Sequence, residues 1–354
     1  MSKEDFYNLT PDGVMSALET VGLQPTGEFT QLNSYENRVF DIRLESPTRD
    51  ATNRVSPRVV TKFYRPGRWS KETILAEHEF LADLVSNGLP AVAPLQLDGL
   101  GRRTTAVIAG HTLALHENIW FTVFPKAVGR MVDELNLADL KRLGRTLARM
   151  HNIGEQKSAP TRPVLTAETY GYENLSILER VVAPEVAQRY FAAAEEILDF
   201  LDYELDQNRA RSFIRIHGDC HRGNILRTDF RADMTAPAGV TTAAASEFFF
   251  VDFDDFCMGP PVQDFWMLLS DGEDTDEGAA ELEALLEGYA EFRRFDESDL
   301  ALIPALRGLR LIHYAAWIAR RWEDPSFPRL FPQFTDFNYW AGEAESLEKL
   351  ARML

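Results

Sequence analysis

The sequence has little cysteine and no long hydrophobic run. Only two of its 354 residues are cysteines, Cys220 and Cys257, which is too few for a disulfide framework and fits a reducing compartment. No apolar stretch approaches the ~18 residues that a membrane-spanning helix needs. Residues 1–5 lack the basic and then apolar layout of a secretory signal. We therefore expect a cytoplasmic protein that has no membrane as a partner.

Positive charge is scarce as well. The chain has 37 lysines and arginines against 55 aspartates and glutamates, a net charge of −18. A field of this sign repels nucleic acid, so we expect no nucleic-acid partner. If such a chain binds a phosphorylated ligand, it must gather metal ions or local cations at the binding site.

The rest of the composition is that of a folded protein. Hydrophobic residues make up 45% of the chain and aromatic residues 11%, which excludes a disordered or fibrous protein. A length of 354 residues predicts one large domain or two lobes. We expect the chain to act as a monomer.

The first third of the chain is predicted to be rich in strands. Short runs of β-branched and aromatic residues at 38–44, 59–64 and 120–124 are bounded by proline or by a Pro-Gly pair. Between them, apolar residues at helical spacing predict a helix over 70–86, with Ser70 as its N-cap.

After residue 125 the pattern becomes helical. Apolar residues at steps of three and four predict long helices over 137–153, 178–205 and 302–322. A β-rich first lobe over 1–124 and a mainly helical second lobe over 125–354 make an α+β fold.

One predicted hairpin interrupts the helical part. Its strands lie near 225–226 and 248–251, and we interpret the Ala-, Thr- and Gly-rich segment 231–246 as a long loop between them.

The densest polar motif runs from His217 through Asn224, and Asp252 follows the second strand of the predicted hairpin. A carboxylate, then a carboxamide five residues later, then a second carboxylate suits phosphoryl transfer. In that reaction Asp219 would accept the proton of the acceptor hydroxyl. Asn224 and Asp252 would supply the oxygen ligands that Mg²⁺ prefers.

The first lobe offers complementary residues. Lys62 lies in the predicted strand 59–64, and Glu77 lies in the predicted helix 70–86. A strand lysine that is held by a helix carboxylate and reaches the α- and β-phosphates of ATP is the protein-kinase arrangement. Alone, either residue would be an ordinary solvated side chain, and it is their combination with Asp219, Asn224 and Asp252 that predicts a site.

The chain resembles kinases of the aminoglycoside-phosphotransferase-like superfamily, and within it a bacterial subgroup of stress-response serine/threonine protein kinases. The resemblance runs through most of residues 10–340 and is carried by Leu32-Asn33-Ser34-Tyr35-Glu36-Asn37-Arg38-Val39, Lys62-Phe63-Tyr64-Arg65-Pro66, Glu77-His78, His217-Gly218-Asp219-Cys220-His221, Gly223-Asn224-Ile225-Leu226, Val251-Asp252, Gly259-Pro260, Val262-Gln263-Asp264, Arg320-Arg321-Trp322 and Asp324-Pro325.

The resemblance implies a bilobal protein-kinase-like fold and a site that uses ATP and Mg²⁺. Asp219 and Asp252 are then the catalytic residues, with Asn224 and Asp252 as Mg²⁺ ligands. Ser34, Lys62 and Glu77 are then the residues that bind ATP.

Two departures and one neighbouring acid bear on the site. The segment 32–39 stands where protein kinases have a glycine-rich loop but contains no glycine, so the backbone approaches a phosphate less freely. Asp252-Phe253-Asp254 replaces Asp-Phe-Gly.

Asp264 opens the apolar segment 263–269, and we interpret it as a brace for the catalytic loop rather than as a helix-terminal charge.

Four functions remain to be weighed. The resemblance favours an ATP- and Mg²⁺-dependent kinase that acts on serine or threonine of a protein. A kinase for a small hydroxyl compound, such as an aminoglycoside, choline or an amino acid, would use the same residues. A dinuclear metal hydrolase built on His217, Asp219 and His221 needs more histidines than follow them. A nucleotide-binding scaffold without activity is disfavoured by the complete set of polar residues.

Overall fold

The chain folds into two units that are described here separately. The computed structural model describes residues 6, 9–49, 55–100, 105–127, 129–132, 134–207, 213–229, 246–270 and 272–354. Packing divides the chain into a first unit, Met1–Leu135 with His221–Phe256, and a second unit, Asn136–Cys220 with Cys257–Leu354. The lobe boundary expected at residue 125 stays a prediction. The predicted loop 231–246 lies outside the described residues, apart from the backbone of its last residue.

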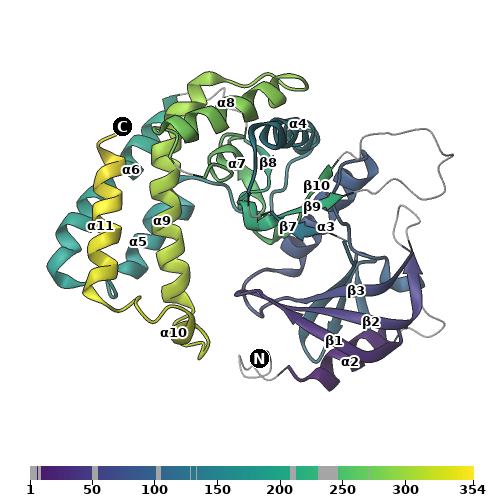
Figure 1. Ribbon diagram of the computed structural model, residues 1–354. Helices are drawn as coiled ribbons and strands as arrows, with labels where there is room; N and C mark the ends of the chain where they lie inside the picture. Colours follow the sequence, from purple (N-terminus) through teal and green to yellow (C-terminus); the bar gives the residue numbers. More distant parts are fainter. Residues whose placement is uncertain are drawn as a thin grey trace. The chain divides into compact units, whose positions relative to one another are not determined.

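The first unit is built on a six-stranded antiparallel sheet. Its strand order is β1-β2-β3-β6-β5-β4, and Figure 1 labels the first three of these strands. All three predicted strands are present, and the register places Lys62 between Val39 and Thr122. The strands are β1 Pro25–Leu32, β2 Arg38–Arg49, β3 Val55–Phe63, β4 Val107–Ala109, β5 Leu113–His116 and β6 Ile119–Pro125.

The helices α2 and α3 and a second small sheet also belong to the first unit. α2 spans Pro11–Thr20, and α3 spans Lys71–Ser86. α3 begins as predicted, because the Ser70 hydroxyl accepts a hydrogen bond from the Thr73 N–H at 3.1 Å. The predicted hairpin is also present and forms an antiparallel sheet of order β10-β9-β7. Its strands are β7 Arg130–Met131, β9 Ile225–Asp229 and β10 Ser246–Phe250.

The second unit is mainly helical, with one two-stranded sheet. Its sheet pairs β8 Ile214–Ile216 with β11 Cys257–Gly259. Its helices are α4 Leu137–Gly154, α5 Glu173–Leu178, α6 Pro184–Gln207, α7 Gln263–Trp266, α8 Asp276–Ala290, α9 Ile303–Arg320, α10 Phe327–Leu330 and α11 Phe337–Ala351, with a π-helical turn at Glu168–Tyr172. Among the described residues, no helix is both long and apolar enough to span a bilayer.

One predicted helix begins later than expected. The apolar spacing predicted a continuous helix over 178–205, but α5 ends at Leu178 and α6 begins at Pro184. Proline lacks the N–H that a helix interior requires, although it fits the first turn of a new helix. The apolar pattern therefore continues across a break in the backbone.

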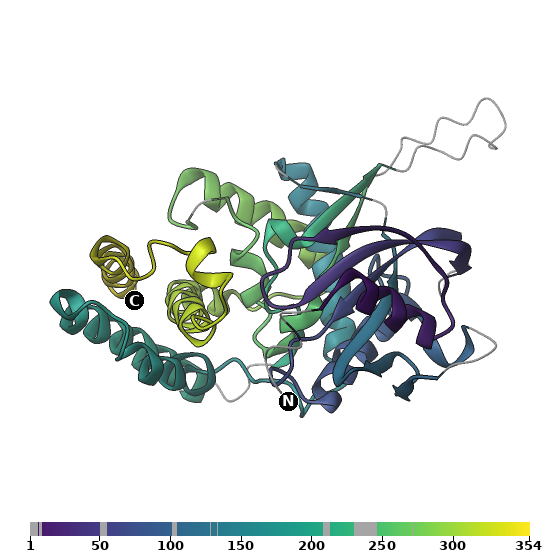
Figure 2. The ribbon, with the colours of Figure 1, turned by 90° about the horizontal axis from the view of Figure 1, so that it is seen from below.

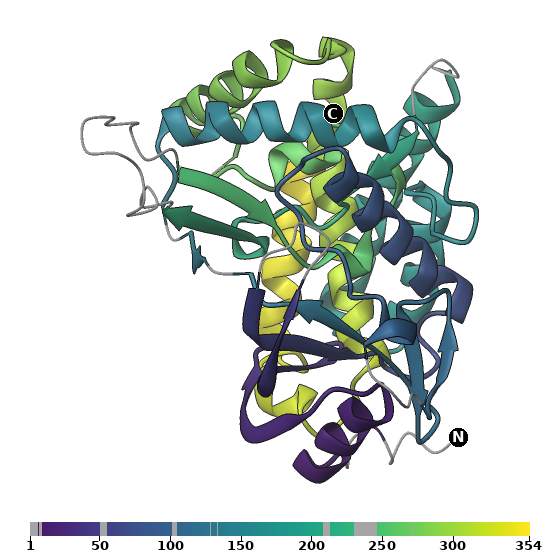
Figure 3. The same cartoon turned by 90° about the vertical axis from the view of Figure 1, so that its right-hand side faces the viewer.

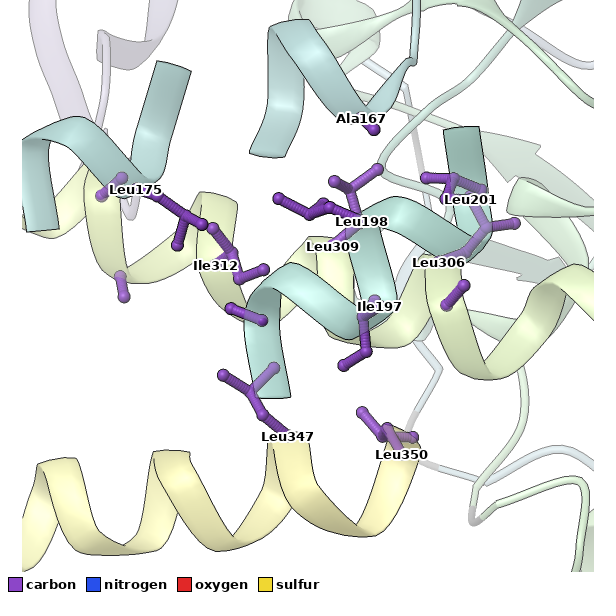
Figure 4. Close-up of a cluster of buried hydrophobic side chains, with 14 of the residues drawn as sticks. Ala167, Leu175, Ile197, Leu198, Leu201, Leu306, Leu309, Ile312, Leu347 and Leu350 are labelled. Atoms are coloured by element: carbon purple, nitrogen blue, oxygen red, sulfur yellow. The ribbon is translucent and has the colours of Figure 1, made fainter. Parts of the chain in front are cut away.

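The core of the second unit lies between α6, α9 and α11. Leu198 of α6, Leu309 of α9 and Leu347 of α11 are buried in one cluster, as Figure 4 shows. Figure 2 shows α6 in teal running past α9 and α11 in yellow-green and yellow. Each helix buries one apolar face against the other two, which is why apolar spacing predicted α6 and α9, whereas α11 was not predicted.

Glycines allow α4 and α8 to pack closely (Figure 3). A Cβ atom on Gly144 would lie 2.1 Å from the Leu285 carbonyl oxygen, and one on Gly288 would lie 1.9 Å from the Lys141 carbonyl oxygen. Each distance is far below contact with a backbone atom, so neither helix has room for a side chain there. Two ion pairs flank this contact, Lys141–Glu287 at 2.8 Å and Arg145–Glu291 at 2.7 Å.

The close contact of α4 and α8 leads to a prediction about the stability of the folded chain. Gly288→Ala should lower the free energy of unfolding by about 1–3 kcal/mol, because the added methyl group forces the two backbones apart. Gly342→Ala is the matched control, since no atom lies within 4 Å of its Cβ position in α11. It should raise stability by about 0.5–1 kcal/mol, the ordinary preference of a helix for alanine. Urea denaturation measures both, and equal effects would contradict the packing.

A partly buried acid on α11 leads to a second prediction about stability. Burial raises the pKa of Glu343 from 4.5 to about 7. The unfolded chain loses this proton near pH 4.5 and the folded chain only near pH 7, so stability falls as the pH rises through that window. Glu343→Gln should therefore raise Tm at pH 8 and have little effect at pH 4. The exposed Glu345→Gln on the same helix is the control, and a pH-independent effect of Glu343→Gln would contradict the prediction.

Candidate active site

The side chain of Lys62 is the centre of the polar cluster in the first unit. Its ammonium lies 3.0 Å from Glu77 Oε1, 2.9 Å from Asp254 Oδ1 and 3.5 Å from Asp252 Oδ1. Lys62 is only 6% exposed and Glu77 1%. Burial opposes the charge, but Asp254, Glu77 and Asp252 outweigh it and raise the pKa of Lys62. Lys62 is therefore a fixed positive charge.

A neutral histidine closes one side of this cluster. The Tyr64 hydroxyl lies 3.2 Å from Glu77 Oε2 and 2.9 Å from His78 Nε2. The other ring nitrogen of His78 lies 2.7 Å from the Thr112 hydroxyl. Burial, together with the charge of Lys62, lowers the pKa of His78 to about 3. His78 is thus neutral and orients Tyr64 without adding charge.

Asp252 is the exposed carboxylate of the cluster. It follows β10, and its side chain is 55% exposed. Its backbone is left-handed, with φ 62° and ψ 66°, a conformation that residues other than glycine rarely adopt. Asp254 differs, because one of its oxygens contacts Lys62 and the other contacts Arg68. Of these two acids, Asp252 is the one with oxygens available to a ligand.

Asn224 lies at the neighbouring end of the same hairpin. β9 starts directly after Asn224, and the pair Ile225–Phe250 is the last rung before Asp252. The Val251 N–H donates to the Asn224 carbonyl at 3.0 Å. Asn224 and Asp252 thus lie just beyond the paired ends of β9 and β10. Among the described residues, no three His, Cys, Asp or Glu side chains are grouped as a metal site.

Asp219 belongs to the second unit. It follows β8 in a turn that requires the positive φ of Gly218, 79°. Its Oδ1 lies 2.7 Å from Arg310 Nη2 of α9. The division between the two units falls between Cys220 and His221, so Asp219 is described apart from Asn224 and Asp252.

Asp264 braces the loop that carries Asp219. It is fully buried, and its carboxylate accepts hydrogen bonds from the N–H groups of His217 and Gly218, each at 2.9 Å. His151 of α4 lies 3.0 Å from the same carboxylate through Nε2. The structure thus agrees with the interpretation of Asp264 as a brace. It fixes the backbone immediately before the candidate base.

The segment 33–37 is held by an arginine instead of by glycine. The Asn37 N–H donates to the Ser34 hydroxyl at 3.3 Å, which closes the turn. Arg65 donates to the carbonyl groups of Tyr35 and Glu36 at 3.2 and 3.0 Å, and it pairs with the Glu36 carboxylate at 3.0 Å. Ser34 lies in this turn and is partly exposed.

Several residues of the site were not predicted from the sequence. They are Glu36, Arg65, Arg68 and His151, each of which contacts a predicted residue or its loop. The Arg65-Pro66-Gly67-Arg68 turn stands directly after the strand of Lys62. Two arginines beside a candidate phosphate-binding lysine in a chain of net charge −18 were a signal that could have been used.

Comparison with known sequences identifies relatives over nearly the whole chain. The model of the phosphotransferase enzyme family (APH) matches residues 28–303. Stress response kinase A of Escherichia coli K12 is 34% identical over 351 residues, which cover 99% of this chain and 94% of that protein. Serine/threonine protein kinase RdoA of Salmonella typhimurium matches with the same identity and coverage.

Solved structures share the fold at lower identity. The amicoumacin kinase hAmiN in complex with AMP-PNP, Ca²⁺ and Ami has a TM-score of 0.67 at 21% identity, covering 99% of this chain and 96% of that one. A microcompartment-associated aminopropanol kinase has a TM-score of 0.64 at 21% identity, covering 96% and 95%. The expected kinase-like α+β fold is confirmed, and the chain belongs to the phosphotransferase enzyme family.

Proposed function

We propose that this chain transfers the γ-phosphoryl group of ATP to a serine or threonine hydroxyl of a protein, and that it needs Mg²⁺ to do so. The observation that carries the proposal is the buried Lys62 ammonium, which is held by Glu77 next to the exposed carboxylate of Asp252. A fixed cation beside an available acid is suited to a metal–triphosphate complex.

In this proposal the first unit binds the nucleotide. Lys62 contacts the α- and β-phosphates, and Glu77 keeps its ammonium in place. Of the three acids around Lys62, Asp252 makes the longest contact, 3.5 Å, so this contact is the easiest to exchange for a phosphate oxygen. Ser34 and the backbone amides of its turn cover the phosphates in place of a glycine-rich loop.

Asn224 and Asp252 would hold the Mg²⁺ ion. The donor set fits, because Mg²⁺ prefers a few oxygen ligands from the protein and takes the rest from phosphate and water. The cluster around Lys62 also has two negative charges in excess, from the cations Lys62, Arg65 and Arg68 and the acids Glu36, Glu77, Asp252, Asp254 and Asp255. Bound Mg²⁺ would neutralise charge that develops on the phosphates.

Asp219 would act on the acceptor. Its carboxylate takes the proton of the hydroxyl as the hydroxyl oxygen bonds to the γ-phosphorus, and the bond from that phosphorus to the bridging oxygen breaks to release ADP. Arg310 keeps the carboxylate oriented at 2.7 Å, and Asp264 fixes the preceding backbone. That Asp219 meets the Asn224 and Asp252 side chains around one ATP molecule is part of the proposal.

A protein acceptor is supported by sequence similarity. The relative named as a serine/threonine protein kinase is 34% identical along 99% of this chain. The two solved kinases, whose names give amicoumacin and aminopropanol, are 21% identical and share the fold alone. We also propose that the chain works as a monomer in the cytoplasm, since all the proposed site residues come from one chain and cysteine is scarce.

Phosphate transfer from labelled ATP tests the proposal. The purified chain should label a generic basic protein on serine or threonine in a Mg²⁺-dependent manner, in preference to aminoglycosides, choline or homoserine. Asp219→Asn should lower turnover by roughly 10²–10⁴, because the amide cannot accept the proton. Asp252→Asn should abolish the Mg²⁺-dependent turnover, and asparagine tolerates the left-handed backbone at this position.

Asp98→Asn is the matched control, because Asp98 is an exposed acid of the first unit that pairs with His111 and lies in no proposed role. It should leave the turnover unchanged. Label on a small hydroxyl compound and none on protein would replace the protein acceptor by the small-molecule alternative. Absence of transfer to every acceptor would refute the proposal as a whole.

A further inference from the structure

A tight turn after β3 brings two arginines together. Gly67 follows Pro66 and has a φ of 80°, and the Arg68 N–H donates to the Arg65 carbonyl at 3.3 Å. Proline followed by a residue with positive φ is typical of a type II turn, whose second central position requires glycine. Arg65 and Arg68 therefore stand at the two ends of one turn. Lys62 lies on the strand that leads into it.

The two arginines have different partners. Arg65 contacts the segment 33–37 through Tyr35 and Glu36, as described above. Arg68 instead pairs through Nη1 with Asp254 and through Nη2 with Asp255, and its Nε lies 3.8 Å from Glu36 Oε1. Its guanidinium therefore joins two neighbouring carboxylates of segment 252–255, from a position 187 residues away along the chain.

Arg68 is largely buried, so water screens its pair with the buried Asp254 little, whereas Asp255 is 42% exposed. Its side chain is 11% exposed. Burial opposes its charge, but Asp255, Asp254 and Glu36 outweigh burial and raise the pKa of Arg68. The planar guanidinium can donate to two acids at once, whereas an ammonium is a single point charge.

The backbone conformation of Asp252 depends on the contacts that hold the residues after it. Its left-handed backbone is costly for a residue other than glycine and persists only where the surroundings enforce it. Phe253 and Phe256 pack on Phe80 of α3, with ring centroids 5.7 and 5.3 Å apart. Those ring contacts hold both ends of the short helical turn Phe253–Asp255. Between them, the two acidic side chains are held by Arg68, and one of them also by Lys62.

We propose that Arg68 is a positioning residue for the metal ligand Asp252: by pairing with Asp254 and Asp255 it fixes the turn that directs the Asp252 carboxylate. The inference rests on the proposed function, because it concerns the Mg²⁺ ligand assigned there. Arg68 contacts neither the ion nor ATP in this proposal. Its removal should weaken metal binding more than nucleotide binding, since Arg65 still holds the segment 33–37.

Binding of Mn²⁺, a paramagnetic substitute for Mg²⁺, tests the inference without an activity measurement. Electron paramagnetic resonance gives the affinity of Mn²⁺ for the full chain saturated with ATP, and calorimetry in EDTA gives the affinity for metal-free ATP. Arg68→Met should weaken Mn²⁺ binding about tenfold, the usual cost of losing a group that orients a metal ligand. Metal-free ATP should bind within about a factor of three of wild type. Arg68→Lys should restore part of the loss, because one acid keeps a partner.

Arg58→Met is the matched control. Arg58 lies on the same strand, β3, and pairs with Asp41 and Glu28, away from segment 252–255. Its loss removes ion pairs of a similar kind from the same unit and should leave Mn²⁺ binding unchanged.

A second variant keeps the test open if Arg68→Met does not fold. Asp255 is 42% exposed, so Asp255→Asn should fold and weaken Mn²⁺ binding in the same direction. Unchanged Mn²⁺ affinity in a folded Arg68→Met chain, or in Asp255→Asn where Arg68→Met is unfolded, would overturn the inference. Equal losses in Arg68→Met and Arg58→Met would do the same. Failure of the wild-type chain to bind Mn²⁺ with ATP would instead count against the proposed function.

Discussion

A buried ammonium group needs acids around it, and the position of Lys62 sets the arrangement of the first unit. Moving an unpaired charge out of water is costly, so Lys62 on β3 keeps carboxylates from α3 and from the turn after β10. α3 and the turn after β10, which are far apart in the sequence, thus both contact the Nζ atom of Lys62. Without the Lys62 ammonium, these neighbouring carboxylates would repel one another. The fold of this unit therefore depends on the charges of its polar cluster.

The second unit solves a similar problem with hydrogen bonds. The carboxylate of Asp264 is satisfied by two backbone N–H groups and by His151. Several hydrogen bonds of this kind offset the free-energy cost of burying a carboxylate. The turn before Asp219 is therefore held through its backbone, and the side chain of Asp219 pairs with Arg310.

The sequence predicted the elements whose side chains alternate or repeat clearly, and it predicted Lys62 near Glu77 because strand, helix and residue order resemble known kinases. β1 was missed because it is exposed along nearly its whole length and carries no apolar alternation. The break before Pro184 was missed because apolar spacing ignores backbone hydrogen bonds. Arg68 and His151 were missed for a different reason. Their partners lie 186 and 113 residues away, and no local pattern reports such contacts.

The turn that contains Ser34 is preorganised, whereas a glycine-rich loop in the same place would be flexible. A glycine-rich loop has many conformations when free, and a ligand that orders it must offset the lost conformational entropy. In the glycine-free turn here, the Arg65 side chain already donates hydrogen bonds to the carbonyl groups of Tyr35 and Glu36. In the proposed function the nucleotide binds a turn that is already ordered, so little loss of conformational entropy opposes association.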